Sequence, residues 1–277
     1  MNFKVLSVLA LAFMAGSVVA QETSPGVATE EVSASAAQTV AMPPPADGLR
    51  MTYDVDGAPV VWQRDAKGAV QIDGLAYPGL VLYVPQTGTV YYQHPDEVGW
   101  VSVTPAMLEG YAYPALLLQG GKWQPYLDAP TRRWEVKAAQ LSCDNWFASA
   151  KAGAVTGLTA RDIWQVFDAL AWLHAGTAVP VCERMAVSAE DGKKVGLPMY
   201  FTGPGGRWQL TELGRTAVAD IPLPATPEPA DDAVRVRLLL HQFGPEDRAD
   251  MLREMGSLPA AQQVLYLQKL MAEQAAY

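Results

Sequence analysis

The chain has 277 residues, half of them hydrophobic and 18% charged, with 8 Trp and 11 Tyr. This composition excludes a fully disordered protein and allows a sizeable core in one or two domains. The formal charge of -9 excludes a basic nucleic-acid surface and a polybasic attachment to anionic lipid. Only two Cys and three His are present, which limits the metal chemistry of the chain.

The first residues have the pattern of a secretory signal peptide. Lys4 precedes an apolar stretch, and Val18 and Ala20 supply the small residues of a cleavage site. The stretch is too short for a comfortable membrane span, which favours a signal peptide over residues 1–20, cleaved after Ala20, rather than a retained anchor. No Cys follows Ala20, so a lipoprotein signal is excluded. We therefore expect a periplasmic or secreted protein with no integral membrane span after cleavage.

Export favours a disulfide between the two cysteines, Cys143 and Cys182. A loop of this length implies about 4 kcal/mol of stabilisation in the chain-entropy model. The alternative is a reactive or metal-binding pair of thiols. The absence of a Cys-x-x-Cys spacing and of a nearby His favours the structural disulfide.

Residues 21–48 are Pro-, Ser- and Ala-rich and contain no aromatic residue, which predicts a flexible tether. Order is expected from Leu49, where apolar and polar residues begin to alternate and a turn follows at Asp56-Gly57. The body, residues 49–222, alternates short strands with turns as an antiparallel meander does. The expected strands cover residues 49–55, 60–64, 70–72, 80–84, 89–94, 100–103, 134–136, 143–147, 181–187, 195–202 and 207–213.

Three parts of the body depart from this pattern. Residues 105–130 are expected to be irregular structure packed on the sheet, or to contain a short helix near 105–110, because Pro and Gly are scattered among their aromatic residues. A turn is expected at residues 190–192. A helix is expected from the Thr159 cap, with Asp162 in a capping box, to Gly176.

A second Pro-rich segment, residues 222–230, precedes a C-terminal helical segment, residues 231–277. Its expected helices cover residues 234–243, 245–255 and 259–274. We expect them to form a small bundle or a cap on the sheet, and the alternative is a partner-binding hairpin. The predicted fold class is therefore α+β, with a curved antiparallel sheet (a meander or half-barrel), a central helix packed on it and a C-terminal helical segment.

Motifs that carry chemistry are scarce. The chain has no Gly-x-Ser-x-Gly, phosphate loop, dinucleotide fingerprint or His-Glu-x-x-His. His94, His174 and His241 fall in three different expected elements, so the sequence does not suggest that they converge on a metal. His94 precedes Asp96 and Glu97 in a hairpin loop, where a solvated turn explains the composition. We therefore expect no catalytic residues, no metal site and no cofactor.

Two smaller features have ordinary explanations. Asp162 and Asp168 are six residues apart on the expected helix, so they point to different faces and are a poor carboxylate pair. Gly203-Pro204-Gly205-Gly206 is expected to be a turn between strands rather than a phosphate-binding nest, because no helix follows it.

Aromatic residues are dense on the expected sheet. Most of them must belong to the core, but a concave sheet lined by aromatic side chains can also hold an apolar ligand, and exposed rings can stack on sugars. The candidate ligand-binding residues are Trp62, Tyr83, Tyr92, Trp100 and Trp208.

Residues 49–222 resemble the periplasmic lipoprotein carriers of the LolA/LolB-like class and its relatives of unknown function. The resemblance lies in the opening segment 51–57, the meander 80–92, and the closing segments 196–201 and 208–213. It implies a sheet curled around helices, with lipid or lipoprotein acyl chains in the hollow. The chain departs from this class in having a Pro-rich tether where the class has a helix, and in its C-terminal helical segment.

The sequence thus favours a periplasmic or secreted non-enzymatic binding protein that holds an apolar or amphipathic small molecule, a lipid or a lipoprotein on its sheet. The alternative is a cell-envelope interaction module that docks a protein partner through its C-terminal helices. A hydrolase built on the loop around His94 is a third hypothesis.

Overall fold

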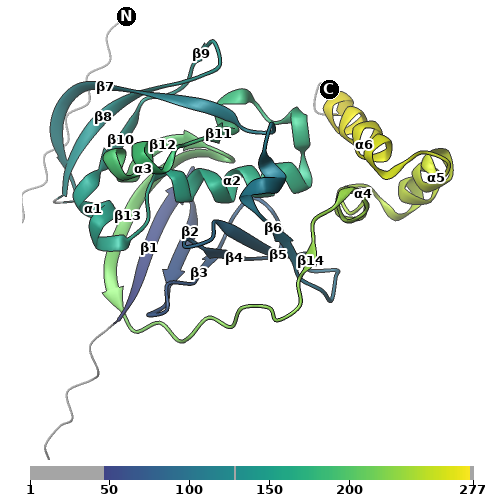
Figure 1. The fold of residues 1–277 in the computed structure, drawn as a ribbon, viewed down its shortest axis with the longest axis horizontal. Coiled ribbons are helices and arrows are strands. Elements are labelled where there is room, and N and C mark those ends of the chain that lie inside the picture. The colour runs from purple at the N-terminus through teal and green to yellow at the C-terminus, as the bar shows by residue number, and fades with distance from the viewer. Residues whose placement is uncertain (1–46, 128, 275–277) are drawn as a thin grey trace, which may run out of the picture. The chain divides into compact units, whose positions relative to one another are not determined.

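The computed structural model of the chain describes residues 47–127 and 129–274, which belong to one unit, Pro44–Tyr277. The predicted signal peptide and residues 21–46 of the predicted tether lie outside the described residues. The predicted fold class is confirmed. A curved sheet of 14 strands, which does not close over the described residues, combines with α-helices in an α+β fold (Figure 1).

The first six strands form the predicted meander, since each pairs antiparallel with the next. Asp56 and Gly57 connect the first two with φ of 48° and 95°, the left-handed conformations that a tight type I′ hairpin needs. The six strands are β1 (Gly48–Val55), β2 (Ala58–Arg64), β3 (Val70–Asp73), β4 (Leu80–Val84), β5 (Thr89–Gln93) and β6 (Val101–Val103).

The second half of the sheet joins the meander where β13 pairs with β1. Its antiparallel strands are β7 (Tyr113–Tyr126), β8 (Ala129–Ala138), β9 (Leu141–Ser142), β10 (Trp146–Ser149), β12 (Leu197–Gly203) and β13 (Gly206–Thr216). Short parallel strands end the sheet on both sides, β11 (Met185–Ala186) beside β7 and β14 (Glu228–Pro229) beside β6. The sheet is therefore mixed, with two parallel pairs at its ends.

The expectation of irregular structure over residues 105–130 is largely wrong. The short 3₁₀ helix η1 (Pro105–Leu108) agrees with it, but β7 is a 14-residue strand. Pro125 is tolerated in β7 because the strand pairs there only with β8, and Pro114 is tolerated because it lies at the start of the strand, beside the short β11. Gly120 and Gly121 lie at a register shift between Gln119 and Trp123. The scattered Pro and Gly therefore mark an edge strand and its bulge.

Residues 181–195 also differ from the prediction. The expected strand over 181–187 is reduced to a 3₁₀ helix η3 (Val181–Glu183) and the two-residue β11. The expected turn at residues 190–192 is instead the helix α3 (Ala189–Val195), because the Ser188 side chain accepts a hydrogen bond from the Asp191 amide at 3.0 Å and caps its first turn. A further short helix, α1 (Ala150–Thr156), was not expected and is capped in the same way by Ser149.

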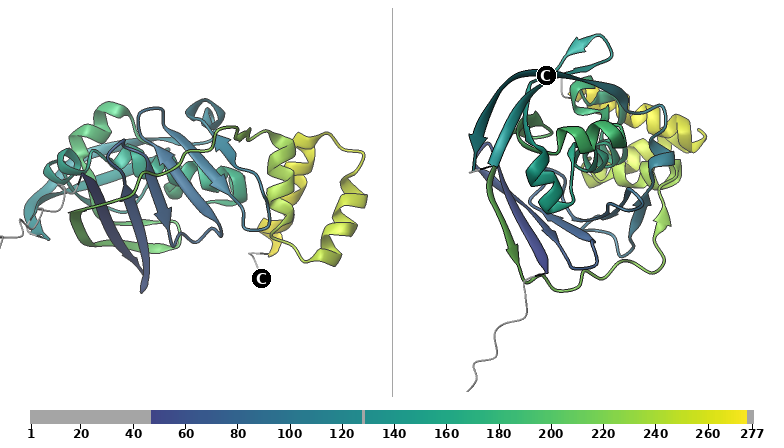
Figure 2. Two further views of the ribbon diagram at one scale, coloured as in Figure 1. Left: turned by 90° about the horizontal axis from the view of Figure 1, so that it is seen from below. Right: turned by 60° about the vertical axis from the view of Figure 1, so that its left-hand side comes forward.

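The predicted central helix is α2 (Ala160–His174), which begins with the Thr159 and Asp162 capping box. The sheet curves around it (Figures 1 and 2). Aromatic rings join the helix to the sheet, with Phe167 and Trp208 centroids 4.9 Å apart. A short 3₁₀ helix, η2 (Gly176–Ala178), follows α2. Because α2 is apolar on most of its surface, its burial against the sheet forms the main core.

The predicted disulfide is confirmed. Cys143 and Cys182 are bonded, with Cα atoms 5.5 Å apart. The bond joins the segment between β9 and β10 to η3, which leads into β11.

The three C-terminal helices are present as predicted: α4 (Asp232–Leu240), α5 (Pro245–Met255) and α6 (Ala260–Gln274). They share a small apolar cluster of their own, which includes Leu239, Phe243 and Leu267. However, Val234 and Leu238 of α4 belong to the main core of the body. No described helix is long and apolar enough to cross a bilayer.

This shared core predicts different effects for two leucines of the C-terminal helices. Leu238→Ala removes a side chain that is 0% exposed and should lower the free energy of unfolding by about 2–5 kcal/mol. Leu252→Ala in α5, where Leu252 is 51% exposed, should change it by less than about 1 kcal/mol. Urea unfolding followed by Trp fluorescence tests this, because all 8 Trp precede α4. Equal effects would show that α4 is not part of the body's core.

Candidate functional site

The aromatic residues predicted to bind a ligand are mostly core residues in the structure. Trp62, Tyr83, Tyr92 and Trp208 are between 0 and 2% exposed. Trp100 is half-buried and packs against a separate small cluster that includes Leu82. The sheet face that carries the four buried residues is covered by α2 and its neighbours.

Three of the four buried aromatic residues, Tyr83, Tyr92 and Trp208, have a hydrogen-bond partner within the fold, whereas Trp62 Nε1 is buried without one. The Tyr83 hydroxyl donates to Asp162 Oδ1 at 2.7 Å, and Trp208 Nε1 donates to the Pro204 carbonyl at 2.9 Å. The structure thus places these rings where they fill space and position α2. A cavity lined by a buried carboxyl group lies elsewhere.

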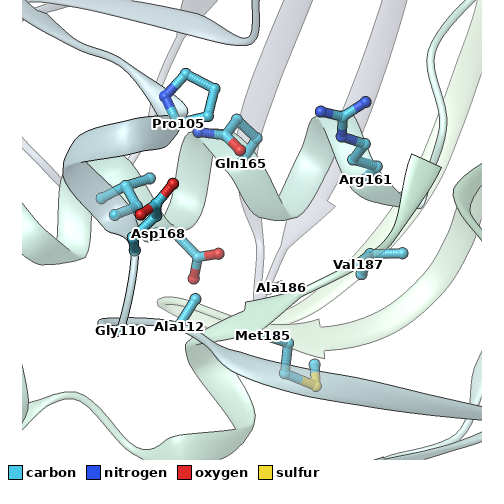
Figure 3. Close-up of a pocket in the computed structure, with 11 residues that line it drawn as sticks. Pro105, Gly110, Ala112, Arg161, Gln165, Asp168, Met185, Ala186 and Val187 are labelled. Atoms are coloured by element: carbon cyan, nitrogen blue, oxygen red, sulfur yellow. The ribbon is translucent and has the colours of Figure 1, made fainter.

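A cavity of about 270 Å³ lies between α2, η1 and β11 (Figure 3). Its size is near the lower end for sites that bind small molecules. Apolar side chains of Leu108, Met185 and Val187 form part of its wall. Three polar residues of α2 line it as well, namely Arg161, Gln165 and Asp168. Glu109, which follows η1, also lines the cavity, so it combines apolar walls with the polar stripe of α2 and one acidic side chain outside that stripe.

Asp168 is the most unusual group in this cavity. The residue is 4% exposed, and its Oδ1 has no hydrogen-bond partner. Burial raises the pKa of Asp168 well above the usual range, although the charge of Arg184 and a hydrogen bond from the Met185 backbone oppose the increase. A buried carboxyl oxygen without a partner costs free energy that a bound hydrogen-bond donor or cation would recover.

Two further polar groups near Asp168 lack partners. Gln165 Nε2 and Arg184 Nε are buried without a hydrogen bond. The Arg184 guanidinium is held between aromatic rings, 5.1 Å from the centre of Tyr111 and 5.0 Å from that of Tyr113. Gln165, like Asp168, lines the cavity, so the site offers an unused donor as well as an unused acceptor.

The helical spacing of three polar residues in the sequence indicates this site. Arg161, Gln165 and Asp168 are spaced i, i+4 and i+7, which places them on one face of a helix. Asp162 does not belong to this stripe, because it points to a different face of the helix from Asp168.

The expectation that the histidines do not converge is wrong. The rings of His94 and His241 stack with centroids 4.1 Å apart. Tyr92 contacts both His94 and His174, with centroid distances of 6.4 and 4.8 Å. His94 lies in the predicted loop, but it is only 7% exposed. Sequence reasoning missed this cluster because the three elements that carry it meet only through the tertiary fold.

Comparisons with known proteins add little. No family model matches the chain, and no curated protein matches it. Among solved structures, PNGF-II in two crystal forms, P21 and C2, aligns with TM-scores of 0.41 and 0.40 at 8% and 7% identity. Each alignment covers 69% of this chain but only 33% and 32% of the PNGF-II chains, so the chain spans about a third of their length. This likeness supports no argument about function.

The raised pKa of Asp168 predicts that Asp168→Asn stabilises the protein at pH 7. Between the usual pKa of a carboxyl group and the raised pKa of folded Asp168, the folded protein holds a proton that the unfolded chain has released. The protein therefore loses stability as the pH rises through this window. We expect a gain of about 1–3 kcal/mol at pH 7 that fades near pH 4. Urea unfolding at both pH values measures it. A loss of stability at pH 7 would contradict the assignment.

A second pH dependence follows from His174, which is 3% exposed and stacks on Tyr77 at 4.9 Å. Burial, with smaller contributions from His94 and His241, lowers its pKa from 6.5 to about 3. The unfolded state therefore binds a proton that the folded state does not, and stability falls by up to about 1.4 kcal/mol per pH unit as pH drops through this window. His174→Phe, which retains a ring against Tyr77, should lose this part of the slope in urea unfolding between pH 7 and 5. An unchanged slope would show that His174 is not buried as described.

Proposed function

We propose that the chain is a periplasmic or secreted, non-enzymatic binding protein that holds a small amphipathic molecule in the cavity between α2, η1 and β11. The ligand has a hydrogen-bond donor or ammonium group that reaches Asp168 and a short apolar part that lies against Leu108 and Met185. The site is therefore not the aromatic face of the sheet that the sequence favoured.

The unpartnered oxygen of Asp168 carries this proposal. A buried carboxyl group is retained at a cost to stability, and buried polar atoms without partners are uncommon in folded proteins. Asp168 faces a cavity whose remaining wall is partly apolar (Figure 3). A ligand that supplies a donor at one end and hydrocarbon at the other complements both parts.

The size of the cavity limits the ligand. At about 270 Å³ the cavity is too small to enclose a long acyl chain. A lipid or lipoprotein ligand of the kind that the LolA/LolB-like resemblance implies would have to leave most of its chain outside. A short ligand with an ammonium head is the better match.

n-Hexylammonium is a suitable probe, with n-hexanol and hexanoate as matched probes of the same chain length. We expect n-hexylammonium to raise the melting temperature saturably, with a Kd on the order of 1 mM for so few atoms. n-Hexylammonium favours the ionised form of Asp168. Hexanol should bind more weakly because it lacks this charge, and hexanoate should bind more weakly than n-hexylammonium because it leaves Asp168 protonated and gains no charge pairing with it. Thermal unfolding over a concentration series measures all three.

Asp168→Asn should abolish the preference for n-hexylammonium over hexanol, with each shift measured from the variant's own melting temperature. Asp250→Asn, an exposed carboxylate of α5, serves as the matched control and should respond as the unmodified protein does. Equal responses of Asp168→Asn and the unmodified protein would reject the cavity as the site.

Partner docking through the C-terminal helices is the second candidate. Leu252 of α5 and Leu265 of α6 are 51% and 62% exposed, whereas Leu238 of α4 is part of the body's core. A docking surface would therefore involve α5 and α6, and α4 would serve to attach them. Single exposed leucines are common on protein surfaces, so this candidate has less support than the cavity.

A further inference from the structure

The loop between β5 and β6 meets the C-terminal end of α4 at a cluster of four side chains. His94, Asp96 and Glu97 belong to the loop, and His241 follows the last residue of α4. His241 Nε2 lies 3.1 Å from Glu97 Oε1, and its Nδ1 lies 3.7 Å from Asp96 Oδ2. His94 Nδ1 lies 3.9 Å from the same Asp96 oxygen.

The hydrogen bonds around His241 decide which of its nitrogens carries the proton. Arg237 Nε donates to Glu97 Oε1 at 3.0 Å, so this oxygen acts as a hydrogen-bond acceptor. Nε2 of His241 must therefore donate to Glu97. In the neutral ring, Nδ1 is then unprotonated and carries a lone pair. Nδ1 is buried with no hydrogen-bond partner.

The same reasoning applies to His94. Its Nδ1 accepts a hydrogen bond from the Asp96 amide at 3.2 Å, so Nδ1 is again the unprotonated nitrogen. Two imidazole lone pairs and a carboxylate oxygen thus face one another, with one atom from each residue within 4.8 Å of the others. The Asp96 amide already donates to one of these acceptors, His94 Nδ1, but His241 Nδ1 has no donor. A cation in this space would pair with all three acceptors, at the cost of the hydrogen bond from the Asp96 amide.

We propose that His94, Asp96 and His241 bind a single divalent transition-metal ion of the zinc class. Two imidazole nitrogens and one carboxylate oxygen are donors that zinc prefers. Glu97 would act as the outer carboxylate that fixes the tautomer and orientation of His241, an arrangement common around zinc-bound histidines. Ligand atoms around a tetrahedral zinc ion are about 3.3–3.5 Å apart, so the site must contract by a few tenths of an ångström or more. The stacked rings must also rotate, so that each lone pair points at the ion.

The surroundings permit this contraction. The Asp96 side chain is 68% exposed, whereas those of His94 and His241 are 8% and 16% exposed. Asp96 can therefore move toward two nitrogens that the fold already holds close together. Its exposure also leaves the fourth coordination position open to water. The ion would link a loop of the sheet to α4, and so fasten the C-terminal helices to the body.

Zinc titration of tag-free protein, freed of metal by a chelator and held at pH 7.5, tests the site. Isothermal titration should give about one equivalent of bound Zn²⁺. Asp96→Asn and His241→Ala should each weaken binding at least 100-fold, and Glu97→Gln should weaken it by about 10- to 100-fold. Asp250→Asn, the exposed carboxylate on α5, should bind as the unmodified protein does. Circular dichroism checks that each variant is folded.

Cobalt supplies a second readout that does not depend on the heat signal. Co²⁺ at this site should give visible absorption that Zn²⁺ displaces, and Asp96→Asn, an exposed substitution, should remove it. No saturable binding, or binding that Asp96→Asn and His241→Ala leave unchanged, would overturn the proposal. The proposal would also be overturned if these variants changed only the pH dependence of unfolding, because the cluster would then bind a proton rather than a metal ion.

Discussion

The burial of α2 in the curve of the sheet is the constraint on which the rest of the structure depends. A helix that is apolar on most of its surface needs cover on several sides, and strands from both halves of the sheet provide it. The bulge between Thr52 and Tyr53 adds local twist where the two halves join. Tyr83 and Trp208 reach the helix from opposite halves, through Asp162 and Phe167.

The same constraint explains where the candidate cavity lies. Burying the polar stripe of α2 (Arg161, Gln165 and Asp168) against an apolar sheet would cost free energy. The stripe faces η1 and β11 instead. The disulfide between Cys143 and Cys182 helps to hold η3, and thus β11, in this position. Asp168 is buried because the elements that cover it are fixed in this way.

Local sequence signals predicted local structure well. The Asp56-Gly57 hairpin, the capping box of α2 and the helices after residue 231 depend on a few neighbouring residues, and all are present. Predictions that gave Gly or Pro too much weight were wrong. Gly192 lies inside α3, where a Cβ would approach Arg161 and Thr159, and Pro114 and Pro125 lie within the edge strand β7. The candidate sites were harder still, because His94 and His241 are brought together only by the contact of α4 with the β5–β6 loop.

The long free edge of β7 has a consequence for the solubility of the protein. Beyond its first two residues β7 pairs only with β8 in the described structure, and it exposes Leu116 and Leu118, which are 56% and 43% exposed. Such an edge is a template for joining another chain strand to strand. The register shift near Gly121 interrupts the regular edge that a second chain would need, and Pro125 cannot donate a backbone hydrogen bond. The Pro and Gly residues that made β7 look irregular in the sequence are thus also residues that disfavour the pairing of a second chain with such an edge.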